Sequence, residues 1–192
     1  MRAVFPVLLC LLGSVAIAAK EKPPIQYVIP LPPKPDFSAL DWLVGEWSGK
    51  TTGRSAAGEV RLSAAFDLEK QFLVLRGEVS FAASKTAPAT RESWMGILSA
   101  MPGEPGFFLR TFSSTGFIAR YRVAVDGPEI RFNPEGGEQP PPGWLFRRAI
   151  QRTGPGEFTE TVQVAPPARP FFDYYTAKLS RVAPQDTPSA AP

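Results

Sequence analysis

The sequence contains no histidine, and its single cysteine is Cys10. Without histidine, the chain cannot form a Ser-His-Asp or Cys-His catalytic arrangement or a zinc site built on imidazole. Cys10 lies in an apolar run that we expect to be removed, so the mature chain should have no disulfide and no thiol chemistry. Phosphate-binding glycine motifs and the Gly-x-Ser-x-Gly motif of serine hydrolases are absent as well. These absences argue against an enzyme and predict no cofactor.

Clustered charge is also missing. The chain has 21 Lys and Arg residues against 18 Asp and Glu residues, which gives a net charge of +3. No run of Lys and Arg could follow a phosphate backbone, so nucleic acid is not an expected partner. Beyond the N-terminal segment, no apolar run is long enough to span a bilayer, and we expect no transmembrane segment in the mature chain.

The N-terminus has the pattern of a secretory signal peptide. Arg2 supplies the positive charge, residues 4–12 form a short apolar run, and small residues precede a cleavage site after Ala18. We therefore expect a periplasmic or secreted protein, with an uncleaved anchor helix as the alternative. The predicted divisions are a signal peptide at 1–18, a Pro-rich linker at 19–35, a folded domain at 36–182 and a disordered tail at 183–192.

The folded domain is predicted to be a short helix followed by strands. Asp36 is a helix-capping residue before an apolar turn at 37–43, and Gly45 ends that turn. Because so short a helix is unstable alone, we expect it to plug one end of the fold. Apolar and polar residues then alternate, as in strands with one buried face. The predicted strands are 46–52, 59–68, 72–81, 91–98, 107–113, 117–125, a seventh after Gly127, 144–152, 158–164 and 171–182.

Short turns between these strands predict antiparallel hairpins in which inward residues face inward residues. The predicted pairs are Leu68 with Leu73, Thr111 with Ala119, Val123 with Ile130, Ile150 with Phe158, and Arg148 with Glu160. A series of sequential hairpins with one apolar face closes into a barrel. The fold class is therefore all-β: a single up-and-down antiparallel β-barrel of about ten strands with a short N-terminal plug helix. A β-sandwich with sequence-local pairing is the alternative.

A motif at residues 40–49 supports the barrel. Its pattern, Leu-x-x-Leu-x-Gly-x-Trp-x-Gly, resembles the start of the first strand in the calycin superfamily. It is most similar to uncharacterised bacterial lipocalin-like domains, and it also resembles nitrobindins and fatty-acid-binding proteins. The resemblance implies that Trp47 closes one end of the barrel against an arginine near the end of the last strand. The matching arginine here is Arg181, and the contact would be a cation–π interaction.

The chain also departs from these relatives. Nitrobindins hold haem iron through a histidine, which this sequence lacks, so haem binding through histidine is excluded. Fatty-acid-binding proteins carry a two-helix lid between the first two strands, and residues 53–58 are too few for one. The resemblance therefore bears on the fold more than on the function.

Inward positions supply the candidate ligand-binding residues. Arg148 and Glu160 are predicted to face each other inside the barrel, where Arg148 could bind a carboxylate or phosphate of a ligand. The alternative is a structural ion pair in the wall. The further lumen candidates are Tyr121, Phe146 and Tyr175. Asp173 and Arg181 share the inward alternation of Tyr175, whereas Glu78 and Glu92 are predicted to point outward.

Three functions follow in order of preference. The first is binding of a small apolar or amphipathic ligand in the lumen, because a barrel of this size has room for one small molecule. The second is a non-binding structural or interaction module of the cell envelope, with the Pro-rich linker as a tether. The third is an enzyme that uses lumen carboxylates on an unknown substrate.

Overall fold

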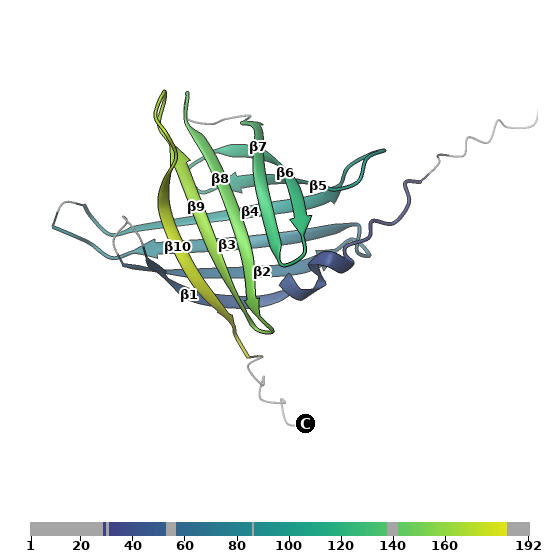
Figure 1. Cartoon of the computed structure of the whole chain (residues 1–192), viewed down its shortest axis with the longest axis horizontal. Coiled ribbons are helices and arrows are strands. Elements are labelled where there is room, and N and C mark those ends of the chain that lie inside the picture. Colours follow the sequence, from purple (N-terminus) through teal and green to yellow (C-terminus); the bar gives the residue numbers. More distant parts are fainter. Residues whose placement is uncertain (1–28, 30, 53–56, 86, 138–141, 184–192) are drawn as a thin grey trace, which may run out of the picture. The chain divides into compact units, whose positions relative to one another are not determined.

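The computed structural model describes residues 29, 31–52, 57–85, 87–137 and 142–183 (Figure 1). The predicted signal peptide, most of the predicted linker and nearly all of the predicted tail lie outside these residues. Residues 31–35 of the linker have no regular secondary structure. In the described part of the chain, no helix has the length and apolar character needed to cross a membrane.

Ten antiparallel strands form one closed barrel, which confirms the predicted fold class. Each strand pairs with its neighbours in sequence, and β1 pairs with β10 to close the ring. In Figure 1, strands β7–β10 cross in front of β1–β4 at a steep angle. The strands are β1 (Gly45–Thr52), β2 (Gly58–Asp67), β3 (Phe72–Phe81), β4 (Thr90–Ala100), β5 (Phe107–Ser113), β6 (Ile118–Asp126), β7 (Glu129–Gly137), β8 (Leu145–Gly154), β9 (Glu157–Ala165) and β10 (Phe172–Arg181).

A short 3-10 helix, η1 (Ser38–Leu43), precedes the barrel. The Asp36 carboxylate accepts a hydrogen bond from the backbone N–H of Ser38 at 2.9 Å and so satisfies one free donor at the start of η1. Leu40 and Leu43 are fully buried in the barrel core. The Phe37 ring stacks on Phe107 of β5 at a centroid distance of 5.2 Å. Burial of these apolar side chains, rather than intrinsic helix propensity, holds so short a helix in place.

The end of the barrel next to η1, called the closed end below, is held by Trp47 and Arg181. The buried Trp47 donates its indole N–H to the Leu43 carbonyl at 2.8 Å. The Arg181 guanidinium lies 4.3 Å from the Trp47 ring centroid and donates to the carbonyls of Val44 and Trp42. One cation thus ties the last strand to the end of η1.

Three predicted hairpin registers are wrong by two residues, and the first two are those of β2–β3 and β6–β7. Leu73 pairs with Phe66, not with Leu68, because the β2–β3 connection is longer than predicted. Leu68 begins this connection with φ at 46°, and its side chain is exposed. Val123 pairs with Phe132, not with Ile130. A shift of two keeps every side chain on its predicted face, because successive residues of a strand point to alternate sides.

The β5–β6 register is as predicted, with Thr111 opposite Ala119. The β8–β9 register differs from the prediction. Arg148 pairs with Val162, and Glu160 pairs with Ile150, so Arg148 and Glu160 are diagonal neighbours and not directly opposite. The reason is an irregularity between Arg152 and Gly154, which moves the turn toward β9.

Candidate functional site

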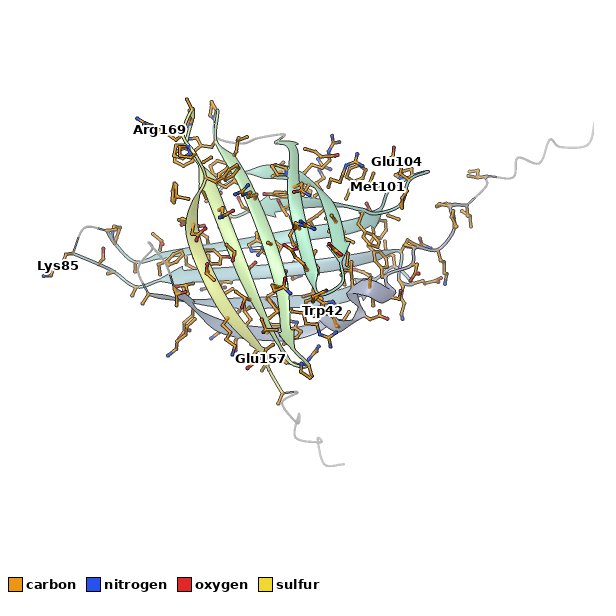
Figure 2. The ribbon with its side chains drawn as sticks, in the orientation of Figure 1. Trp42, Lys85, Met101, Glu104, Glu157 and Arg169 are labelled. Atoms are coloured by element: carbon orange, nitrogen blue, oxygen red, sulfur yellow. The ribbon has the colours of Figure 1, made fainter. Side chains whose placement is uncertain are left out.

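The far end of the barrel, opposite the closed end, is where β3 ends at Phe81 and β10 begins at Phe172. Figure 2 labels Lys85 and Arg169 on loops at this end, and Trp42 and Glu157 at the other. Most inward side chains near the closed end are fully buried, among them Leu73, Leu98, Ile130, Ile150, Phe158 and Leu179. Toward the far end, several inward side chains keep exposed surface, namely Glu92, Trp94, Thr111, Ala119, Tyr121, Phe146, Arg148, Val162 and Tyr174. Solvent therefore reaches part of the inner face.

A buried ion pair lies at the boundary between these two regions. The Arg148 Nε donates to one carboxylate oxygen of Glu160, and the Tyr175 hydroxyl donates to the other at 3.3 Å. The Glu160 side chain has no exposed surface, whereas that of Arg148 is 12% exposed. Because each charge has its partner, the pair is electrically neutral. Both oxygens of its carboxylate already accept a hydrogen bond.

The Arg148 guanidinium is also packed against aromatic rings. It lies 4.0 Å from the Trp94 ring centroid and 5.9 Å from that of Phe132. Trp94 in turn lies on Gly77, where a Cβ atom would be only 2.2 Å from the indole. Only glycine at position 77 leaves room for this stack. Trp94 was not among the predicted site residues, although it shares the inward alternation of Leu98 in its strand.

The tyrosines of the lumen are held in their neutral form. Burial, together with the nearby Glu160 carboxylate, raises the pKa of Tyr175 far above its ordinary value. Burial also raises the pKa of Tyr121, against the opposing effects of Arg148 and of a hydrogen bond with Thr111. Burial of Arg148 disfavours its charge, but Glu160 and Tyr175 outweigh that effect and raise the pKa of the guanidinium. The site thus combines a permanent cation, its own anion and neutral hydroxyl groups.

A second polar pair lies nearer the far end. The Tyr174 hydroxyl donates to the Glu92 carboxylate at 2.9 Å. The prediction that Glu92 points outward is wrong, because Glu92 pairs with the buried Val79 and shares the alternation of Trp94. Burial, followed by the charge of Glu92, raises the pKa of Tyr174.

The remaining predicted positions are those of Asp173, Glu78 and Phe146. Asp173 is exposed and accepts a hydrogen bond from Gln163 at 2.6 Å, so its predicted inward position is wrong. The cause is an irregularity of β10 between Asp173 and Tyr175. Glu78 points outward, as predicted, and forms an ion pair with Arg91. Phe146 lies on the inner face and is half-buried.

Two hollows lie mainly on the outer face of the wall. One, of about 440 Å³, crosses β2 to β5, and its lining includes Arg61, Arg76 and Met95. The other, of about 910 Å³, follows β1 near Lys50 and Arg181. Among the described residues, no three Asp, Glu, His or Cys side chains gather in a way that could hold a metal ion.

Comparison with known proteins adds support for the fold. No protein-family model matches the chain, and no curated protein is significantly similar to it in sequence. The crystal structure of Rv2717c from M. tuberculosis is similar, with a TM-score of 0.58 and 21% sequence identity. The match covers 77% of this chain and 97% of that one. At this identity the likeness shows the fold alone.

Proposed function

We propose that this barrel binds a small amphipathic ligand in its lumen, which the ligand enters from the far end. The observation that carries the proposal is the exposed surface that several inward side chains keep toward the far end. Trp94, Tyr121 and Arg148 keep exposed surface on the inner face, although Val79, Phe81 and Val164 toward the same end are buried. Exposed aromatic and polar groups inside a closed wall are typical of small-molecule sites.

The chemistry of the lumen supports an amphipathic ligand. Trp94, Phe146 and Val162 offer apolar surface for the body of a ligand. The exposed part of Arg148 and the Tyr121 hydroxyl offer hydrogen bonds to a polar group. Because Glu160 already neutralises Arg148, the pair favours a hydrogen-bond acceptor without requiring a full negative charge. In this proposal the ion pair has both roles that the sequence suggested: Glu160 is structural, and Arg148 contacts the ligand.

The other two functions are less well supported. Glu160 is unsuited to acid–base catalysis, because both of its oxygens are bonded and the side chain is enclosed. An interaction module would not need polar groups on the inner face. If the predicted signal peptide is cleaved, the protein binds its ligand in the periplasm or outside the cell.

Native mass spectrometry of the mature protein, purified from cells without detergent, tests the proposal. We expect a bound mass in the wild-type protein and its loss in Ala119→Trp, which fills the lumen near Thr111. Ala124 is exposed on the outer face of the same strand, so Ala124→Trp is the matched control and should keep the bound mass. Circular dichroism checks that both variants are folded. Equal occupancy of the two variants contradicts lumen binding.

A further inference from the structure

The irregularity of β10 places two tyrosines in the lumen. Asp173 pairs with Gln163 and Tyr175 pairs with Val162, so Tyr174 is the extra residue of a β-bulge. In a regular strand, neighbouring residues point to opposite faces, but the bulge lets Tyr174 and Tyr175 both face inward. Their ring centroids are 5.9 Å apart. Bulges interrupt the hydrogen-bonded ladder, and they commonly serve to redirect a side chain next to a functional site.

The carboxylate that Tyr174 contacts has no cationic partner among the described residues. Glu92 accepts the Tyr174 hydroxyl at 2.9 Å and is half-buried on the inner face. A neutral hydroxyl stabilises a carboxylate but leaves its charge in place. Glu160 is different, because Arg148 neutralises it. The neighbouring Arg91 points outward and pairs with Glu78. A partly desolvated charge without a partner is unfavourable, and a bound cation would relieve that cost.

The aromatic surroundings of Glu92 also favour a cation. The Phe81 ring packs against Tyr174 at a centroid distance of 5.7 Å and against Tyr175 at 6.2 Å, in both cases edge to face. The face of an aromatic ring is electron-rich and attracts alkylammonium groups. Burial and Glu92 keep Tyr174 neutral, so its ring and hydroxyl remain in place over a wide pH range. Among the described residues, the far end thus combines a carboxylate without a cationic partner with three adjacent rings, of which Tyr174 keeps exposed surface while Phe81 and Tyr175 are buried.

From this arrangement we infer that Glu92 binds a positively charged nitrogen, so that the ligand is an amphipathic amine or quaternary ammonium compound. The inference rests on the proposed function and specifies its ligand class. The nitrogen lies at Glu92 beside Tyr174 and Phe81, and the apolar body runs deeper, toward Trp94. The neutral Arg148–Glu160 pair below it neither repels the cation nor competes for it.

Isothermal titration of the mature protein with three decyl probes tests this inference. The probes are decyltrimethylammonium, decyl sulfate and decyl maltoside, each below its critical micelle concentration. We expect the cationic probe to bind most tightly and Glu92→Gln, which keeps a hydrogen-bond acceptor for Tyr174, to weaken it about tenfold or more. Glu78→Gln removes a carboxylate from the outer face of the adjacent strand and should leave all three affinities unchanged.

A second measurement keeps the test decisive if Glu92→Gln does not fold. In the wild-type protein, affinity for the cationic probe should fall as salt rises from 20 to 500 mM, and affinity for the maltoside should not. Equal binding of the three probes, or a Glu92→Gln protein that binds the cation normally, overturns the inference and leaves the proposed function standing. A wild-type protein that binds none of the probes contradicts both.

Discussion

At the scale of single residues, the charges in the lumen differ in how they are compensated. Glu160 has no exposed surface and accepts bonds from Arg148 and Tyr175, so its charge is fully matched. Glu92 is half-buried and is contacted by a neutral hydroxyl. The first arrangement stabilises the wall of the barrel, and the second leaves a charge that a ligand could neutralise.

Removing Arg148 should therefore destabilise the fold. In Arg148→Met the Glu160 carboxylate stays buried without its cation, and we expect the free energy of unfolding to fall by about 3 kcal/mol. The double variant Arg148→Met/Glu160→Leu removes both charges and should recover most of that loss, since two apolar side chains need no partner. Urea unfolding followed by circular dichroism measures both. A single variant within about 0.5 kcal/mol of the wild type would show that the pair is not buried in solution.

The tyrosines of the lumen should ionise only at a pH above that of a free tyrosine. The pKa values of Tyr121, Tyr174 and Tyr175 are all raised above the ordinary value of 10.0, first by burial and then, for Tyr174 and Tyr175, by a neighbouring carboxylate. Their neutral forms are favoured in the folded state, so this stability is present below about pH 10 and is lost as pH rises further. Absorbance at 295 nm should show Tyr174 and Tyr175 un-ionised at about pH 11 in the folded protein, and Tyr121 should ionise at a higher pH than a free tyrosine. Ionisation of all four tyrosines together near pH 10 would contradict their burial.

At the scale of elements, the β10 bulge and the closed end position the site. The bulge can be removed without changing the faces of its neighbours. Deletion of Tyr174 leaves Asp173 pointing outward and Tyr175 pointing inward, because the two then follow each other in a regular ladder. We expect the deletion variant to fold and to bind the decyl cation less tightly than the wild type.

Deletion of Thr176 is the control for this experiment. Thr176 lies in the regular part of β10, opposite Thr161, so its loss turns Tyr175 to the outer face and breaks its hydrogen bond with Glu160. We expect this variant to unfold, as seen by circular dichroism and by the loss of a cooperative thermal transition. Two deletions with the same stability would show that Tyr174 is not a bulge residue.

Arg181 holds the closed end through its contacts with Trp47 and with the end of η1. Replacing it with alanine removes a cation–π contact and two charge-assisted hydrogen bonds, and we expect a loss of about 2 kcal/mol. Lys178 is exposed on the same strand and pairs with Glu157, so Lys178→Ala should cost less than about 0.5 kcal/mol. Thermal unfolding measures both variants. Equal losses would mean that Arg181 acts as an ordinary surface charge.

At the scale of the whole molecule, the alternation of apolar and polar residues predicted more of the structure than the turn sequences did. The inward positions of Arg148, Glu160, Tyr121, Phe146 and Tyr175 follow from a period of two, and the barrel depends only on that period. The registers depend on turn length. The left-handed backbone conformations from Leu68 to Lys70 are energetically unfavourable for residues other than glycine. No residue in this stretch indicated them, because it contains no glycine or asparagine.

The rest of the site needed three-dimensional information. Glu92 could have been placed inward from the alternation that it shares with Trp94 and Leu98 in the same strand. Tyr174 could not, because it reaches the lumen through a bulge, and a bulge reverses the expected alternation without a distinctive residue to mark it. The packing of Trp94 on Gly77 likewise depends on the β3–β4 register, since the two residues are far apart in sequence.

The central claim is that ligands bind inside the barrel at its far end and not in the hollows on its outer wall. A ¹H–¹⁵N NMR titration of the mature protein with decyltrimethylammonium tests it most directly, because each backbone amide reports its own position. The account predicts that the largest shift changes occur in lumen residues such as Glu92, Tyr121 and Tyr174, with small changes at the closed end around Leu43. Largest changes at Arg61, Arg76 and Met95, which line the outer hollow, would contradict it.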